Sequence, residues 1–269
     1  MELLISLFKK ILELILGSQT QKAFPELEKN EENRFVITQK VYEKEEEPNH
    51  IICNGEPVEI DWHKVVLWDE PGGLKCGPKQ YKKRTGKRKP KMFVVHWDAC
   101  LSSKMMAGVL KERGLSVPFA IDNDGTIYQL MDTKHIAWHA RGVNTQSVGV
   151  EIANGVSLKY QKWYEKHGHG RRPIVEGVYL NGKKLTPMLG FYPVQVEALK
   201  ALIKAVCGAH DIPLKVPVDQ EGNLVMSVDK RVTGRSFRGV VGHYHVTSTK
   251  SDPAGLALDK VIDDVVEGN

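Results

Sequence analysis

The apolar residues in the middle of the chain fall into short runs separated by turn residues, which predicts a β-sheet. Residues 92–98 form a β-branched and aromatic run with a histidine near its end, which is typical of a buried strand. Residues 117–121 and 126–130 form two more runs, and the Asp-Gly pair between them predicts a tight hairpin turn. Residues 144–152 supply a further apolar strand.

Two segments towards the C-terminus have helical periodicity instead. Residues 193–208 begin with a proline in the first turn and place their apolar side chains on one face, which predicts a helix that packs on the core. Residues 256–266 predict a second, C-terminal helix. The expected fold class is therefore α/β, with a mixed central β-sheet flanked by helices.

Residues 1–18 have a different pattern. Between residues 2 and 16, Leu and Ile surround a narrow polar stripe, which predicts a strongly amphipathic helix. The segment is too short and too charged to span a bilayer, and it lacks the features of a secretory signal. Three roles stay open: the helix lies on a membrane surface, associates with a copy of itself, or docks on the folded domain.

Residues 19–90 predict an N-terminal extension with short strands and a basic linker. Residues 20–50 are rich in Glu and Lys and predict a lightly structured linker. Residues 51–76 contain two or three short apolar runs, which either form a small module or extend the central sheet. Residues 79–91 carry eight cations, as a nucleic-acid arm or a tether to anionic envelope polymers would. Because only Tyr81 offers a stacking ring, we do not expect nucleic acid as a partner.

About forty residues separate the strand that ends near Ala153 from the helix that begins near Pro193. An insertion of this length is usually functional or has structure of its own. Residues 178–185 predict a hairpin within it. Its aromatic rings either face a sugar or peptide, or pack the insertion against the domain; they are Trp163, Tyr164, Tyr179 and Tyr192.

Composition agrees with this organisation and adds two constraints. The 269 residues, 41% of them hydrophobic, suffice for one good core plus an extension, or for two small domains. The net charge of +5 favours polyanionic partners. The four cysteines form no Cys-x-x-Cys pair, which favours synthesis in a reduced compartment, although a disulfide between Cys53 and Cys76 stays open.

Potential metal ligands gather in residues 242–253, where His243, His245 and Asp252 lie close to Lys250. Two imidazoles and a carboxylate suit a borderline-soft divalent ion such as zinc, and the lysine would place positive charge beside it. His96, at the end of a predicted strand, would be a rigidly held ligand.

Glu151 lies inside an apolar predicted strand. Burying a carboxylate is costly unless it is paired or functional, so Glu151 is a candidate catalytic group.

Other metal-binding candidates are weaker. His135 and His139 are four residues apart, which would place them on one face of a helix, but their neighbours predict a loop. His167 and His169 lie in a segment rich in Gly, Lys and Arg that predicts a solvated loop. We expect Cys100 to be a buried thiol rather than a ligand.

Four longer motifs occur along the chain in this order: VVHWD, PFAIDNDGTIYQL, AWHARGVNTQSVGVEI and VVGHYHVTSTKSDP. Together they resemble the zinc-dependent N-acetylmuramoyl-L-alanine amidases of type 2, the family of the amidase-type phage lysozymes and the peptidoglycan-recognition proteins. The resemblance covers about residues 91–266, and we therefore assign a zinc amidase domain to residues 91–269.

The resemblance implies a role for each motif residue. His96, His243 and Asp252 correspond to the zinc ligands of the family. The glycine before His243 favours this residue, although His245 remains an alternative ligand. Lys250 corresponds to a catalytic-site lysine of the enzymatic branch.

Two further roles follow from the resemblance, together with one departure. His139 corresponds to a histidine along the substrate groove, and Asn144 is expected to shape its loop. Phage members often carry a tyrosine near the zinc, just ahead of the first hairpin strand, but this chain has Val117-Pro118-Phe119 there. Relatives without the tyrosine use a glutamate in a Ser-x-Gly-x-Glu strand, so the general-base role passes to Glu151.

The implied activity is hydrolysis of the amide bond between N-acetylmuramic acid and the L-alanine of the stem peptide, with Zn2+ activating the water. The expected partner is bacterial peptidoglycan. The expected setting is a phage or prophage endolysin, made in the host cytoplasm without a signal peptide and acting at the cell wall after release. Two alternatives stay open: a non-catalytic peptidoglycan-binding module, and a virion or regulatory protein that uses the basic arm.

Overall fold

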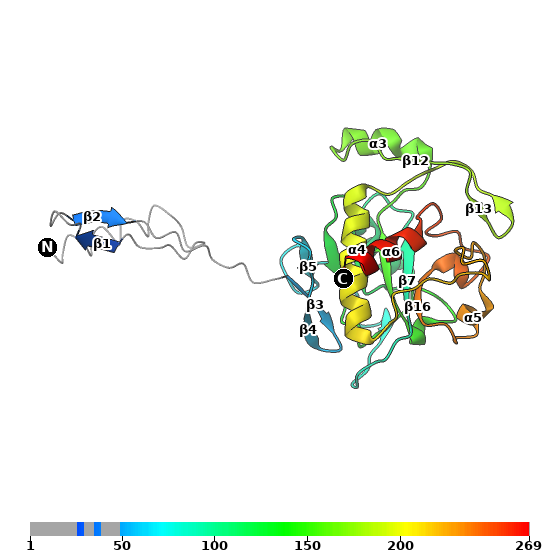
Figure 1. Ribbon diagram of the computed structural model, residues 1–269, viewed down its shortest axis with the longest axis horizontal. Helices are drawn as coiled ribbons and strands as arrows, with labels where there is room; N and C mark the ends of the chain where they lie inside the picture. The colour runs from blue at the N-terminus through cyan, green and yellow to red at the C-terminus, as the bar shows by residue number, and fades with distance from the viewer. Residues whose placement is uncertain (1–25, 30–34, 39–48, 269) are drawn as a thin grey trace. The chain divides into compact units, whose positions relative to one another are not determined.

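The computed structural model describes residues 26–29, 35–38 and 49–268 (Figure 1). The chain divides into two compact units, residues 1–47 and 48–269. In the first unit, β1 (Glu26–Lys29) pairs antiparallel with β2 (Phe35–Thr38). The amphipathic helix predicted for residues 1–18 lies outside the described residues. Among the helices that the structure describes, none has the length and apolar character needed to cross a membrane.

A mixed β-sheet of six strands forms the centre of the second unit. In order across the sheet, the strands are β16 (Gly239–Gly242), β7 (Met92–Trp97), β11 (Ser147–Ile152), β8 (Phe119–Ile121), β9 (Ile127–Gln129) and β5 (Val65–Leu67). Neighbouring strands are parallel except β8 and β9, which form the predicted antiparallel hairpin. The apolar runs of the sequence are therefore confirmed as strands of one mixed sheet.

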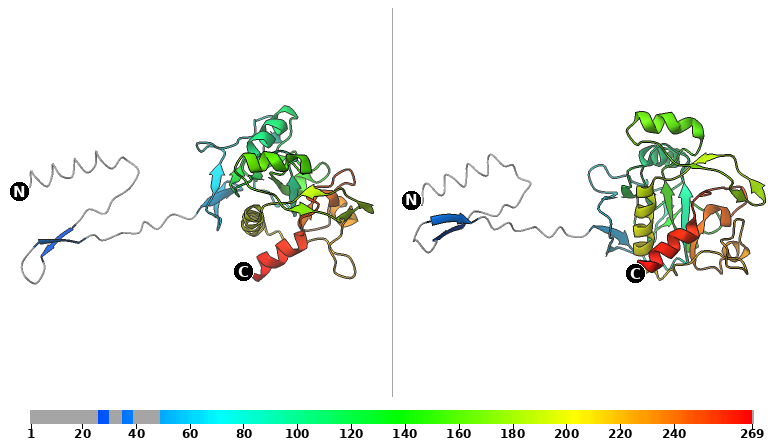
Figure 2. Two further views of the ribbon diagram at one scale, coloured as in Figure 1. Left: turned by 90° about the horizontal axis from the view of Figure 1, so that it is seen from above. Right: turned by 45° about the horizontal axis from the view of Figure 1, so that its top comes forward.

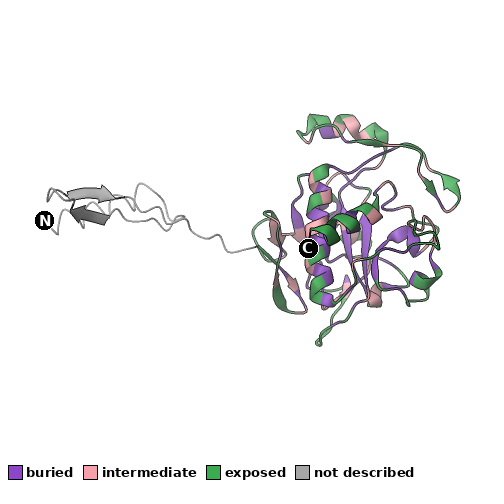
Figure 3. Cartoon of the chain, viewed as in Figure 1, coloured by how far each residue is buried: buried purple, intermediate pink, exposed green. Residues whose placement is uncertain are grey.

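Helices cover both faces of this sheet (Figure 2). On one face, α4 (Pro193–His210) and α6 (Leu258–Glu267) share a core with side chains of β7, β8 and β11, including Phe93 and Val95. On the other face, Met106 of α2 (Ser103–Glu112) packs in a cluster with Ala120 of β8. Figure 3 shows that the buried residues follow the central strands and the inward sides of α4 and α6. The predicted α/β class is confirmed.

The helices differ in how far the sequence predicted them. Those expected at residues 193–208 and 256–266 are confirmed as α4 and α6, and Pro193 lies in the first turn of α4. Helix α2 was not predicted. It begins where the Ser102 side chain accepts a hydrogen bond from the Met105 N–H at 3.2 Å, a typical N-cap. A short helix, α5 (Lys230–Thr233), precedes β16.

Residues 49–91 pack on the sheet or extend it. β5 is its edge strand, and β3 (His50–Cys53) pairs with β4 (Glu56–Glu59) in a hairpin that contributes Ile51 to the core beneath α4. In the basic segment, β6 (Tyr81–Lys82) pairs with β10 (Ile136–Ala137). All four cysteines lie in this described unit and are buried and free, so the disulfide between Cys53 and Cys76 is absent.

The insertion between β11 and α4 has structure of its own. A 3-10 turn (Leu158–Tyr160) leads into α3 (Gln161–Lys166), and β12 (Ile174–Val175) pairs with β15 (Met188–Leu189). β13 (Tyr179–Leu180) and β14 (Lys183–Lys184) form the predicted hairpin. Tyr164 and Tyr192 are buried, whereas Tyr179 is 60% exposed. Some aromatic rings of the insertion therefore pack against the domain, and others face the solvent.

Candidate active site

Three parallel strands end at the same edge of the sheet and carry candidate residues there. His96 lies near the end of β7, and Glu151 of β11 is its partner in the strand register. β16 ends at Gly242, and the chain continues as a 3-10 turn, His243–His245. The carboxyl edge of parallel strands is the usual place for ligands in α/β sheets.

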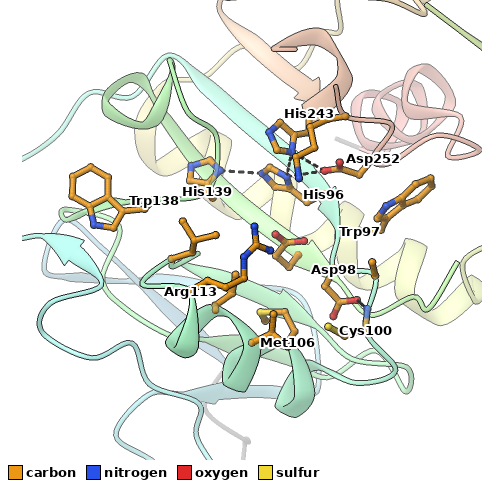
Figure 4. A pocket seen from close by; sticks show the side chains of 16 residues that line it. His96, Trp97, Asp98, Cys100, Met106, Arg113, Trp138, His139, His243 and Asp252 are labelled. Atoms are coloured by element: carbon orange, nitrogen blue, oxygen red, sulfur yellow. Dashed lines mark hydrogen bonds and ion pairs between the residues drawn. The ribbon is translucent and has the colours of Figure 1, made fainter. Parts of the chain in front are cut away.

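The side chains of His96, His243 and Asp252 converge at this edge (Figure 4). The Nδ1 atoms of the two histidines lie 3.0 Å apart, and each lies 2.9 Å from Asp252 Oδ2. All three side chains are buried. The structure thus brings together the three residues that the family resemblance implies as ligands.

This triangle of atoms fits a divalent cation. If both Nδ1 atoms carried a proton, the two N–H groups would face each other, and if one were bare, its lone pair would face that of the carboxylate. A cation among the three atoms would satisfy them all, and two imidazoles with one carboxylate are a common ligand set for zinc. His96, His243 and Asp252 are therefore the residues that could hold a metal ion.

His96 and Asp252 are in the ionisation states that metal binding requires. Burial and the neighbouring His243 lower the pKa of His96 to about 4, so its ring is neutral at pH 7, as a ligand must be. Burial alone would raise the pKa of Asp252, but its contacts with the imidazoles of His243 and His96 outweigh this effect and hold the pKa well below its usual range. The carboxyl group is therefore ionised.

His245 does not take part in this group. Its Nδ1 accepts the Gly242 N–H at 2.9 Å, and its Nε2 donates to the Val225 carbonyl oxygen at 2.7 Å. The two histidines do not point the same way because the chain turns as a 3-10 helix here instead of continuing as a strand. Both ring nitrogens of His245 are engaged with backbone groups, so it is a structural residue.

His139 lies beside the metal-binding group. Its Nδ1 lies 3.0 Å from His96 Nε2, and its own Nε2 lies 3.2 Å from Ser147 Oγ. Asn144 Oδ1 accepts the N–H groups of His139 at 3.1 Å and of Ala140 at 2.7 Å, so Asn144 holds the loop in shape. His139 also lines the pocket described below.

The other histidine pairs are not metal sites in the described unit. His135 stacks on Tyr81, with ring centroids 5.0 Å apart, and shares no helix with His139. His167 stacks on Trp163 in the insertion, with ring centroids 4.0 Å apart.

Two partly buried carboxyl groups, those of Glu151 and Asp98, adjoin the metal-binding group. Within the described residues, Glu151 Oε2 and Asp98 Oδ2 have no hydrogen-bond partner. Burial raises the pKa of Glu151 well above its usual range, and the carboxyl groups of Asp252 and Asp98 raise it further. A carboxyl group of this kind holds and releases a proton closer to neutral pH, as a general acid or base does.

A pocket opens beside these groups and has both polar and apolar walls (Figure 4). Its lining includes Glu151 and two exposed cations, Lys250 and Arg113. Trp97 and Trp138 lie on opposite sides of the metal-binding group. The pocket therefore suits a substrate with a polar reacting group and apolar flanks.

Sequence reasoning did not identify Asp98, Arg113 or Ser147 as site residues. Arg113 caps the end of α2, and the pairs of apolar residues at 105–106 and 109–110 are the helical signal that could have revealed this helix. No sequence pattern marks Asp98 or Ser147 as site residues, because their importance depends on contacts across strands.

Comparisons with known proteins identify a family that matches most of the chain. A family model described as N-acetylmuramoyl-L-alanine amidase matches residues 86–255. Among solved structures, the chain is similar to the N-acetylmuramoyl-L-alanine amidase LysC from Clostridium intestinale URNW, with 16% identity, a TM-score of 0.43, and coverage of 76% of this chain and 99% of that chain. It is also similar to the Ph2119 endolysin from Thermus scotoductus MAT2119 bacteriophage Ph2119, with 14% identity, a TM-score of 0.41, and coverage of 75% and 99%. No curated protein matches the chain.

Proposed function

The chain belongs to the N-acetylmuramoyl-L-alanine amidase family, and we propose that it hydrolyses the amide bond between N-acetylmuramic acid and the L-alanine of the peptidoglycan stem peptide. The observation that carries this proposal is the buried triangle of His96, His243 and Asp252 beside the unpaired carboxyl oxygen of Glu151. A ligand set and a proton acceptor in one pocket are what metal-assisted hydrolysis requires.

We propose zinc as the ion that His96, His243 and Asp252 hold. When bound, zinc supplies a Lewis acid that polarises the scissile carbonyl and lowers the pKa of water to about 7. The neutral imidazole of His96 and the ionised carboxylate of Asp252 are already in the protonation states of ligands.

The remaining steps fall to residues of the pocket. Glu151 takes a proton from the attacking water as the new C–O bond forms, and passes it to the nitrogen of L-alanine as the C–N bond breaks. Lys250 donates a hydrogen bond to the carbonyl oxygen while negative charge develops on it. The products are the carboxylate of the lactyl group and a free L-alanine amino group, so atoms and charges balance.

We propose an endolysin role for this activity, in which the enzyme reaches the peptidoglycan after release from the cytoplasm of a phage-infected or lysogenic host. Residues 1–18 would then attach the enzyme to a membrane surface or to a second copy of the chain. The exposed cations of residues 79–91 would favour the anionic polymers of the cell envelope.

Digestion of purified sacculi tests the proposed reaction. We expect mass spectrometry to detect stem peptides with a free L-alanine amino group and glycan strands without stem peptides, and we expect a chelator to abolish both and added zinc to restore them. New reducing sugar ends, or cuts within the stem peptide, would contradict the amidase assignment. Binding to sacculi without any release would favour the peptidoglycan-binding module instead.

A further inference from the structure

Strand β11 presents Ser147, Gly149 and Glu151 on one face, because alternate residues of a strand point the same way. Glu151 is the register partner of His96. The space above Gly149 is filled by the ring of His139: a Cβ atom on Gly149 would lie 2.5 Å from His139 Nδ1, which is too close for any real contact. The missing side chain therefore makes room for an imidazole between Ser147 and His96.

This imidazole completes a chain of hydrogen bonds whose direction is fixed at one end. Ser147 Oγ lies 3.0 Å from the Val143 carbonyl oxygen, and only the serine can supply the proton between these two oxygens. The lone pair of Ser147 Oγ is then left to accept from His139 Nε2–H, at 3.2 Å. His139 Nδ1 is consequently bare and accepts from His96 Nε2–H, at 3.0 Å.

We propose that Ser147 and His139 are positioning residues that hold His96 as its Nε2–H tautomer, so that its bare Nδ1 faces His243 and Asp252. Gly149 contributes to this positioning because its missing side chain leaves room for the His139 ring. This proposal rests on the proposed function, because it takes His96, His243 and Asp252 to be the ligands of zinc. A histidine that binds a metal through one nitrogen generally donates the other N–H to a fixed acceptor, which orients the ring.

Hydrogen bonds to the surrounding backbone hold Ser147 and His139 in position. Asn144 accepts the backbone N–H of His139 at 3.1 Å. The buried Arg88 donates through Nη2 to the carbonyl oxygens of Ser147, at 2.8 Å, and of Asn144, at 3.3 Å. The basic segment thus contributes one of its cations to the interior, where it ties the loop before β11 to the rest of the domain.

The first test removes the hydroxyl group. We expect Ser147→Ala to weaken zinc binding about 10- to 100-fold in competition with a chromogenic chelator, as for other residues that orient a metal ligand. Ser103→Ala is the matched control, because Ser103 is also fully buried but its Oγ has no partner in the described structure. A Ser147→Ala variant that binds zinc within twofold of the wild type would overturn the proposal.

Two further comparisons separate positioning from general stability. Gly149→Ala is expected to weaken zinc binding by displacing the ring, whereas Gly208→Ala, on an exposed site of α4 with no atom within 4 Å of the added Cβ, should not. His139→Asn keeps an acceptor near the position of Nδ1 and should retain more zinc affinity than His139→Leu. Equal zinc affinities for the two His139 variants would overturn the role of the acceptor.

The tautomers can also be observed directly. Long-range 1H–15N NMR spectra of the zinc-loaded protein identify the protonated nitrogen of each ring, and we expect Nε2–H for both His96 and His139. An Nδ1–H tautomer at His139 would overturn the proposal. None of these measurements needs hydrolysis, so a wild-type protein that binds zinc as expected but leaves sacculi intact would count against the proposed function alone.

Discussion

Replacing Arg172 by methionine tests what holds the insertion to the catalytic domain. The guanidinium is 2% exposed, and its Nη1 donates to the Gly190 carbonyl oxygen at 2.9 Å and to Gln195 Oε1 at 3.1 Å. Its Nη2 donates to the Ala153 carbonyl oxygen at 2.8 Å and to Asn123 Oδ1. One side chain of the insertion therefore bonds to the end of β11, to α4 and to the turn of the β8–β9 hairpin.

The size of the effect follows from these bonds. The guanidinium also lies between the rings of Tyr164 and Tyr192, 4.2 Å from each centroid, and a methionine would keep favourable sulfur contacts with both rings. The substitution therefore mainly removes four hydrogen bonds, each worth about 1 kcal/mol net, and should lower the free energy of unfolding by about 4 kcal/mol. In a domain of this size that corresponds to a fall of about 8–16 °C in Tm.

Guanidinium-induced unfolding, followed by circular dichroism, measures this difference. Arg171→Met is the matched control, because Arg171 pairs with Glu165 at 3.7 Å through largely exposed side chains and should change stability by about 0.5 kcal/mol or less. A loss below about 1 kcal/mol for Arg172→Met would refute the reasoning, since it would mean that the cost of burying the guanidinium cancels its hydrogen bonds.

Three further predictions concern the pocket. Asp252→Ala should abolish zinc retention after dialysis, measured by atomic absorption, and unchanged zinc content would remove the proposed metal site. Glu151→Gln should retain zinc but release stem peptides about 100- to 10,000-fold more slowly, and an unimpaired rate would mean that another group is the base. Arg113→Gln removes a cation that lowers the pKa of Glu151. Because Glu151 must be ionised to accept a proton, the acid limb of the pH–activity profile should move to higher pH, whereas Lys111→Gln on the same helix should leave it in place.

The strands could be predicted from sequence because burial on both faces gives them mainly apolar runs, as in residues 92–97 and 147–152. The β8–β9 hairpin was marked by its Asp-Gly turn, and α4 by its proline and apolar face. Helix α2 was missed because its apolar residues occupy only two adjacent pairs among exposed polar neighbours. The direction of His245 was missed because periodicity describes strands and helices, and this histidine lies in a turn.

The site was predictable only to the level of residue type and family motif. The resemblance singled out His96, His243 and Asp252, but pattern alone gives no reason for residues from distant segments to meet. The roles of Ser147 and Gly149 depend on which ring lies over β11, and that ring belongs to a separate loop. Contacts of this kind follow from strand register and loop path, which a single sequence does not encode in any local signal.

The metal-binding group joins positions that are far apart along the chain: His96 is separated by 147 residues from His243 and by 156 from Asp252. Closing such long loops is entropically costly, and domains that depend on contacts of this range fold slowly. A chain still emerging from the ribosome cannot form the metal-binding group until Asp252 has been made and the parallel strands β7 and β16 have paired. Synthesis itself would thus delay the proposed hydrolytic activity, and binding of the proposed zinc ion would report that the whole domain has folded.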